Sequence, residues 1–414
     1  MTHPAPVVAQ RSVGDVDILA AQFGDVDQTA LAVYRVRDDS EDSRNAGLAA
    51  LGIRAMLRGT EELDATALAF AIETMGGTLS PALSADLLGF AATVLTPHAA
   101  AATRLLLDVL ERPRLAPDIV AIERGLLVED ARSVADDMFR FPLQLALGTA
   151  YGDIGYGSPL LGTPESIATF DAETVRAWHA GTLAGRITLV AVGSEAAERM
   201  ADQLAELVGL RRGTRVASGF ASPVGASVAP SIAPGVRVAH RDRKQSALAM
   251  IFPGPSRRSA GRFAAETWAA IAAGLGGRLF ESLRSARSLA YSVVANSWQR
   301  RRAGALITYI ATDPARLDEA RGAMLEELET FRREPPGDEE LARATAMLAG
   351  HAEIARQGAG ALAGEIAEAW LLGLGLAELE DPAAPYRTID REAVHAACQS
   401  LDPALRAEGV VQPG

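Results

Sequence analysis

Few side chains in this 414-residue sequence stand in the arrangements that enzymes use for catalysis. The six histidines are scattered, and no two are four residues apart, so the helical His pair that holds many zinc ions is missing. The single cysteine, Cys398, lies in an alanine-rich helical pattern and is interpreted as a small buried hydrophobic residue. No G-x-S-x-G nucleophile elbow occurs in the sequence. The sequence thus shows neither a metal site nor a nucleophile of its own.

The composition limits the classes of partner. Apolar residues make up 49% of the chain and charged residues 22%, as in ordinary globular proteins, and the net charge is -12. Because phosphate binding needs a basic surface, we expect no nucleic-acid partner. The one basic run, Arg300 to Arg302, is interpreted as a solvated hairpin turn between two strands.

Membrane and export signals are also missing from the pattern. No run approaches the ~20 apolar residues of a membrane span. The first residues do not show a basic segment followed by an apolar one, the pattern of a signal peptide. We therefore expect no membrane association and a cytoplasmic location, although an export signal that had been removed would leave no trace.

Two halves of the chain repeat one another. The apolar run Ala30–Val36 has a counterpart in Ala247–Pro253, and Phe170–Ala177 has one in Ile389–Ala396. These pairs are offset by 217 residues (247 − 30) and 219 residues (389 − 170). A shared offset across separate short matches indicates two copies of one structural unit.

Each unit gives the same order of expected elements, listed here for the first and then the second unit. They are a strand (29–37; 245–253), two helices (46–58 and 64–75; 260–274 and 277–287), two strands (78–83 and 86–95; 289–298 and 304–311) and several further helices. Hairpin-like strand pairs separated by runs of helices predict an α+β class rather than a doubly wound sheet. We expect an N-terminal domain at 1–215, a Gly/Ser/Ala/Pro-rich linker at 216–234 and a C-terminal domain at 235–414, each an antiparallel-rich mixed sheet with packed helices.

Several segments resemble one peptidase family. They are Gly47–Thr60, Ile72–Leu79, Glu123–Glu129, Tyr156–Ile167 and, as the nearest match, Gly276–Val293. Together they resemble the pitrilysin/insulinase-type zinc metallopeptidases, or inverzincins, which include the processing-peptidase subunits. The resemblance runs from about residue 28 to 400. It implies two homologous α+β domains that form one half of a clamshell.

The resemblance also implies that this chain lacks the zinc site. The family carries H-x-x-E-H on its active-site helix, and those three positions fall here on Ala50, Ile53 and Arg54. Alanine offers no lone pair to a metal, isoleucine cannot take a proton as the general base, and arginine places a permanent cation where a dication would sit. Glu129 falls on the position of the third ligand, and we expect it to form an ion pair with Arg54. No metal or other cofactor is expected in this chain.

The resemblance extends to an arginine and a tyrosine of the family's second domain. The family's second domain supplies such a pair, seven residues apart, facing the zinc across a closed chamber, and Arg284 and Tyr291 match in type and spacing. A guanidinium and a phenol can both donate hydrogen bonds to the oxyanion that forms when a peptide carbonyl is attacked. Spacing alone would favour a surface charge and a half-buried strand aromatic. Arg287 lies between them, but the spacing favours Arg284.

Three roles follow as expectations. In the first, this chain is the non-zinc subunit of a two-chain metalloendopeptidase: a homologous partner supplies zinc and the general base, and this chain supplies Arg284 and Tyr291. It would be inactive alone, and the resemblance implies short or unfolded polypeptides as substrates. In the second, it is a structural subunit, as in respiratory cytochrome complexes. In the third, it binds peptides without cleaving them.

Overall fold

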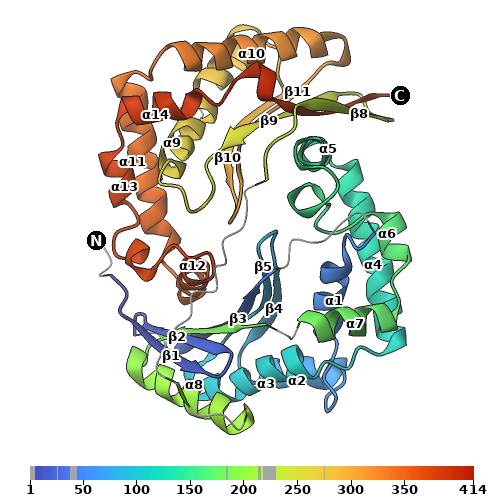
Figure 1. Cartoon of the computed structure of the whole chain (residues 1–414), viewed down its shortest axis with the longest axis vertical. Coiled ribbons are helices and arrows are strands. Elements are labelled where there is room, and N and C mark those ends of the chain that lie inside the picture. Colours follow the sequence, from blue (N-terminus) through green and yellow to red (C-terminus); the bar gives the residue numbers. More distant parts are fainter. Residues whose placement is uncertain are drawn as a thin grey trace.

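Two β-sheets form the centre of the molecule (Figure 1). The computed structural model describes residues 5–25, 27–37, 44–182, 185–212, 216–217, 230–274 and 276–414. The first sheet has the order β4-β5-β3-β6-β2-β1-β7. Its strands are β1 (Val8–Val13), β2 (Val16–Gln22), β3 (Gln28–Val36), β4 (Thr78–Leu83), β5 (Leu87–Leu95), β6 (Ile187–Gly193) and β7 (Val216–Ala217). The second sheet has the order β10-β11-β9-β12-β8. Its strands are β8 (Gly235–Arg241), β9 (Ser246–Gly254), β10 (Ser292–Gln299), β11 (Gly304–Thr312) and β12 (Ala407–Pro413).

Helices surround both sheets. Those of the first half are α1 (Leu48–Met56), α2 (Ala65–Thr74), α3 (Ala99–Glu111), α4 (Pro117–Asp136), α5 (Arg140–Tyr151), α6 (Pro164–Ala168), α7 (Ala172–Thr182) and α8 (Ala197–Arg212). Those of the second half are α9 (Arg262–Ala273), α10 (Leu317–Arg333), α11 (Asp338–Ala355), α12 (Ala359–Leu371), α13 (Ala384–Thr388) and α14 (Arg391–Cys398). Short turns are η1 (Thr96–His98), η2 (Gly155–Gly157), η3 (Phe280–Ala286), η4 (Pro314–Arg316), η5 (Leu376–Leu379) and η6 (Pro403–Leu405). Among the described residues, no helix is long and apolar enough to cross a bilayer.

The two sheets repeat one topology. The run β4-β5-β3-β6-β2 matches β10-β11-β9-β12-β8, and in each the central strand pairs antiparallel with both neighbours. The only parallel pairs in the described part of the sheets are β2 with β6 and β8 with β12, which also correspond. The predicted α+β class with two homologous mixed, antiparallel-rich sheets is confirmed.

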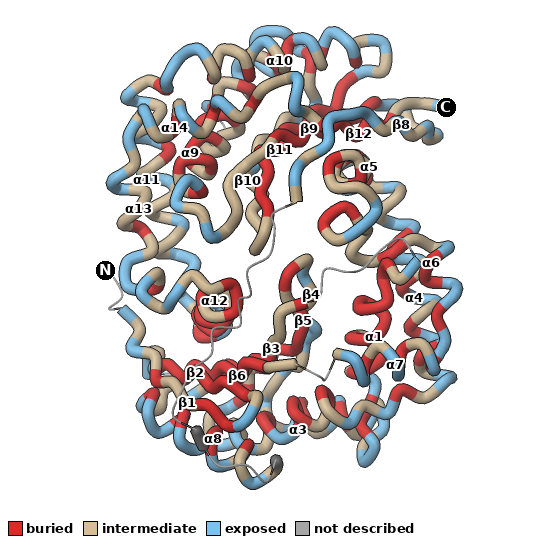
Figure 2. The backbone as a smooth tube through the Cα atoms, in the orientation of Figure 1, coloured by how far each residue is buried: buried red, intermediate tan, exposed pale blue. Residues whose placement is uncertain are grey.

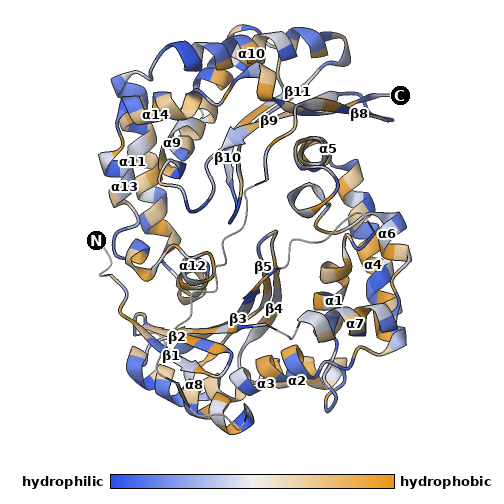
Figure 3. Ribbon diagram, in the orientation of Figure 1, coloured by the Kyte–Doolittle hydropathy of each residue, from blue (hydrophilic) through white to orange (hydrophobic). Residues whose placement is uncertain are grey.

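Local sequence explains the elements that matter for the site. Helix α1 is buried at eight of its nine positions because its sequence is almost wholly apolar. Helix α4 begins at Pro117, whose fixed φ suits the first turn of a helix, and alternates buried and exposed faces. The outer helix α10 is largely hydrophilic in Figure 3, and its apolar stripe faces the second sheet.

Each half of the chain lends one helix to the other half's sheet. Helix α5 packs on β8, β9 and β12 of the second sheet, and α12 packs on β3 and β6 of the first. The apolar side chains of α12 join those of the first sheet in one buried cluster, and Figure 2 shows this helix buried where it faces β2 and β3. Besides a core of its own, each half therefore shares a buried cluster with the helix that the other half contributes.

A hairpin turn also joins the halves. Residues 300–303 connect β10 to β11, which confirms the predicted turn, but the expectation that it is solvated was wrong. The backbone N–H of Arg301 donates to the buried carboxylate of Asp86 (3.0 Å), and that of Arg302 donates to the hydroxyl of Tyr156 (3.2 Å). Tyr156 in turn donates to Asp86 (2.6 Å). The turn thus docks in a polar pocket of the first domain.

Only part of the expected linker is described, and one expected helix takes a different form. Most of the linker, residues 218–229, lies outside the described residues, and its first two residues pair with β1 as strand β7. The helix expected at 277–287 is the short π-helical segment η3, which ends at Ala286.

Candidate functional site

The centre of α1 is apolar and buried, and an arginine follows it. Ala50 and Ile53 are buried in the first core. Arg54, one residue further, reaches α4 and donates to the carboxylate of Asp130 at 2.6 Å. The position of a metal-binding imidazole is therefore taken by one half of an ion pair.

A second ion pair lies one helical turn away. Arg58 donates through Nε to the carboxylate of Glu123 at 2.6 Å, and the side chain of Glu123 is only 4% exposed. Arg54 and Arg58 are four residues apart on α1, and Glu123 and Asp130 are seven residues, about two turns, apart on α4. Two ion pairs therefore connect α1 to α4.

The predicted pair between Arg54 and Glu129 was wrong. Glu129 lies on the outer face of α4 and accepts from Arg132, three residues along the same helix, at 2.6 Å. The buried face of α4 carries Glu123 and Leu127, and a further step of three residues reaches Asp130 rather than Glu129. This periodicity was readable in the sequence and would have corrected the choice.

These residues do not fit a catalytic zinc ion. Such a site needs three donors with free lone pairs, and the carboxylate that reaches Arg54, that of Asp130, is already bonded to its guanidinium. Across the described ranges, no three side chains of the His, Cys, Asp and Glu types gather closely enough to hold a metal. No catalytic step is therefore assigned to a metal held by this chain.

Arg284 projects from a segment held by two buried leucines. It lies in η3, whose π-helical geometry is often found at functional sites. Leu283 and Leu289 are both buried in the second core, and the N–H of Leu289 donates to the carbonyl of Leu283 at 2.8 Å. The residues between them are forced outward. The guanidinium of Arg284 is exposed and lies 5.0 Å from the ring centroid of Phe280.

Tyr291 lies immediately before β10. Its backbone N–H donates to the carbonyl of Ala311 on β11 at 2.8 Å, which fixes the main chain. Its side chain is 56% exposed, and neither its hydroxyl nor the guanidinium of Arg284 bonds to another described residue. No direct contact joins the two side chains in the described chain. Both groups are thus anchored through the backbone and open to a ligand.

An arginine outside the motif holds the loop between them. Ser288 has φ +49°, a left-handed conformation that few residues other than glycine adopt. Arg316 donates to the carbonyl of Ser288 at 2.9 Å and to that of Arg287 at 3.4 Å, and also binds Glu319. Nothing in the spacing of the sequence indicated this contact, because it joins residues 28 positions apart.

Comparison with known proteins decides the family. Residues 39–163 match the family model described as "Insulinase (Peptidase family M16)", and residues 169–348 match the one described as "Peptidase M16 inactive domain". The chain belongs to peptidase family M16. This is the family that the sequence resemblance indicated.

Relatives and solved structures agree with the M16 assignment. A protein of Streptomyces coelicolor named as an uncharacterized zinc protease is 22% identical over 84% of this chain and 76% of its own length. A Pseudomonas fluorescens structure of a peptidase M16 inactive domain superposes with a TM-score of 0.85 at 18% identity, over 99% of this chain and 98% of the other. A chain of complex III2 from Candida albicans gives 0.77 at 17% identity, over 98% and 95%. These structures share the fold.

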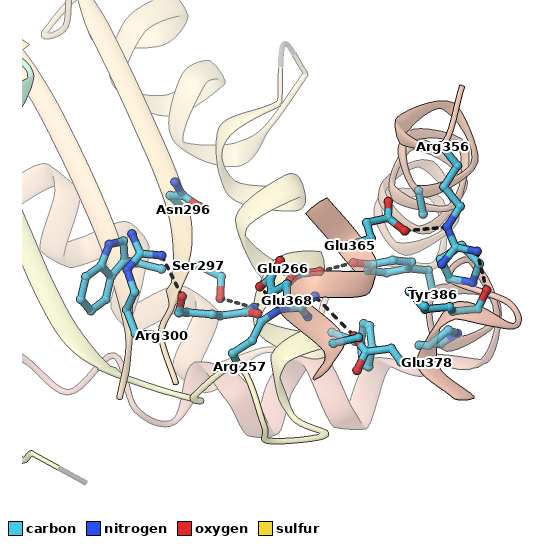
Figure 4. A pocket seen from close by; sticks show the side chains of 18 residues that line it. Arg257, Glu266, Asn296, Ser297, Arg300, Arg356, Glu365, Glu368, Glu378 and Tyr386 are labelled. Atoms are coloured by element: carbon cyan, nitrogen blue, oxygen red, sulfur yellow. Dashed lines mark hydrogen bonds and ion pairs between the residues drawn. The ribbon is translucent and has the colours of Figure 1, made fainter. Parts of the chain in front are cut away.

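The M16 chain also contains a polar cavity of about 520 Å³ between β10, the start of α9 and helices α12 and α13 (Figure 4). Ion pairs cross its walls: Arg257 with Glu368 at 2.8 Å and Arg356 with Glu365 at 2.7 Å. Burial, and then the carboxylate of Glu266 to which its hydroxyl donates, raise the pKa of Tyr386 above the usual tyrosine range. This cavity was not anticipated from the sequence.

Proposed function

We propose that this M16 chain is the non-zinc subunit of a two-chain zinc metalloendopeptidase. The observation that carries the proposal is the contrast between the two sites. The two ligand positions of α1 hold Ala50 and an ion-paired Arg54, and the position of the general base holds Ile53, whereas Arg284 and Tyr291 stand anchored, exposed and unbonded within the described chain.

The role proposed for the pair is to bind substrate and stabilise negative charge. A homologous subunit that retains H-x-x-E-H would hold the zinc and the general base, and the zinc would supply activation of water for hydrolysis of a peptide bond. Arg284 and Tyr291 would donate hydrogen bonds to the oxyanion that forms at the peptide carbonyl or to the adjacent substrate backbone. Removal of one such donor typically costs about 3 kcal/mol in the transition state.

Mixing tests this proposal. The chain would be purified alone and together with a zinc-bearing M16 homologue from the same cell, and hydrolysis of an internally quenched peptide would be followed. Activity is expected in the mixture and not with either chain alone. Full activity of the homologue by itself, unchanged on adding this chain, would contradict the proposal.

A second candidate is a structural or peptide-binding subunit without catalysis. It is favoured by the similarity of fold to a chain of complex III2 from Candida albicans. Under this reading the mixture forms a complex, but substitutions of Arg284 and Tyr291 leave any peptidase activity unchanged. The exposed and unbonded pair favours the first candidate, because an assembly subunit has no need of it.

A further inference from the structure

Arg300 differs from the other arginines that line the cavities of the second domain. It follows the last residue of β10 and is partly buried, yet no carboxylate of the described chain lies within ion-pairing distance of it. Its neighbours in the same cavity, Arg257 and Arg356, each pair with a glutamate. A cation drawn from water without a counter-charge is an unusual and costly arrangement.

The guanidinium of Arg300 is held in place by neutral contacts. It lies 4.4 Å from the ring centroid of Trp298, and Nη1 donates to the carbonyl of Gln299 at 2.9 Å. The Nε atom is buried and has no acceptor. Burial lowers the pKa of Arg300 below the usual arginine value. Stacking fixes the plane of the group while leaving part of its donor fork unused.

The acidic groups around Arg300 are committed elsewhere. Asp86 attracts it through space but accepts hydrogen bonds from Tyr156 (2.6 Å) and from the N–H of Arg301 (3.0 Å). Glu368 also attracts it but is bonded to Arg257 at 2.8 Å. Neither carboxylate is free to turn toward Arg300 without breaking these contacts.

Two cavities meet at this residue. Arg300 lines the 520 Å³ cavity and also a second one of about 560 Å³, which lies between β4, the start of β5 and helix α12. Both have the size of ordinary ligand pockets. Asn296 and Ser297 line the first cavity as well and provide an amide and a hydroxyl for hydrogen bonding (Figure 4).

We propose that Arg300 forms an anion subsite that binds a carboxylate of an acidic peptide. A carboxylate offers two oxygens that match the planar guanidinium fork, and binding would supply the missing counter-charge. The choice of a peptide rests on the proposed function, since β10 joins Tyr291 to Arg300. At about 3.3 Å per residue, the nine residue steps from 291 to 300 (300 − 291) span roughly 30 Å, so one extended substrate could contact both ends.

Calorimetric titration of the purified full chain tests the subsite without the partner. The probes are three decapeptides of glycine, alanine and serine: one with a free C-terminus, one amidated, and one amidated with an internal glutamate. Wild type, Arg300→Gln, Arg300→Lys and the control Arg258→Gln are compared, because Arg258 is an exposed arginine outside both cavities. Circular dichroism establishes that each variant is folded.

We expect the carboxylate-bearing probes to bind and the neutral one to bind at least about tenfold more weakly, because a neutral amide cannot supply the charge that pairs with the guanidinium. Arg300→Gln should remove that preference, whereas Arg300→Lys should retain part of it and Arg258→Gln all of it. Binding of the free C-terminus alone identifies a chain terminus as the ligand, and binding of both identifies any acidic group. No binding of either acidic probe, or equal binding by Arg300→Gln, overturns the subsite. Neither result depends on peptidase activity, so failure of the anion subsite can be distinguished from failure of the proposed function.

Discussion

At the scale of single residues, two ion pairs that differ in burial join α1 to α4. Asp130, the partner of Arg54, has a side chain that is 52% exposed, whereas that of Glu123, the partner of Arg58, is 4% exposed. Removing the arginine of the exposed pair costs little. Removing the arginine of the other pair leaves a buried carboxylate without a counter-charge, which costs more.

We therefore expect Arg54→Met to lower the unfolding free energy by at most about 1 kcal/mol. Arg58→Met should lower it by about 3 kcal/mol, because Glu123 would lose its partner inside the protein. Urea unfolding followed by circular dichroism measures both. The double variant Arg58→Met with Glu123→Gln should recover part of the loss. Equal losses of unfolding free energy in the two arginine variants would show that burial does not determine how much each ion pair contributes.

Residue identities predicted from the sequence were only partly right. The loss of both helix ligands and of the general base follows directly from Ala50, Arg54 and Ile53, since no side-chain geometry lets these residues bind a metal or accept a proton. The acidic partner was misplaced by one residue because the motif was aligned by position and not by the face of α4. The burial of Arg300 could not be predicted, because it depends on a turn that docks against a distant part of the chain.

At the scale of elements, the loop from η3 to β10 is held by contacts that sequence spacing does not reveal. The left-handed Ser288 is a strained conformation for a residue with a side chain, and Arg316 bonds two carbonyls at that point. The three strands expected in each unit match β3, β4 and β5 and then β9, β10 and β11, whereas β1, β2, β6, β8 and β12 were not anticipated. The π-helical turn was not anticipated either, because its apolar pattern is that of an ordinary helix.

Arg316→Met should loosen this loop without unfolding the domain. We expect faster hydrogen exchange in a peptide covering residues 284–291, where the N–H groups of Leu289 and Tyr291 are bonded to carbonyls. Arg391→Met is the matched control, since Arg391 forms an exposed pair with Asp338 on the outer surface. Mass spectrometry of exchanged peptides measures the effect. Unchanged protection in Arg316→Met would show that the loop is held by its leucines alone.

At the scale of the whole molecule, each domain read from the sequence repeat has its own core, but one face of each sheet is covered by a helix from the other half. Helix α12 covers one face of the first sheet, where Leu19, Val190 and Val192 are buried, and α5 does the same for the second sheet. A repeat offset identifies the two copies. It cannot show that a helix of each copy crosses to the other, because the pattern records which face is apolar and not what covers it.

This exchange predicts that residues 1–217 do not fold alone. Without α12 the first sheet would expose an apolar face, at a cost of about 2 kcal/mol for each large side chain uncovered. Expressed alone, the fragment should bind a hydrophobic dye and lack cooperative thermal unfolding, and coexpression with residues 218–414 should restore both properties. A fragment that unfolds cooperatively by itself would contradict the shared core.

The central claim is that this chain contributes charge stabilisation to a zinc site that it does not hold. The direct measurement is the turnover number of the purified two-chain complex at saturating peptide, with zinc content determined for each preparation. Arg284→Ala and Tyr291→Phe should each lower turnover by about a hundredfold with zinc content unchanged. Arg287→Ala, which removes a surface pair with Glu326, should leave turnover unchanged. Full turnover in both Arg284→Ala and Tyr291→Phe would contradict the account.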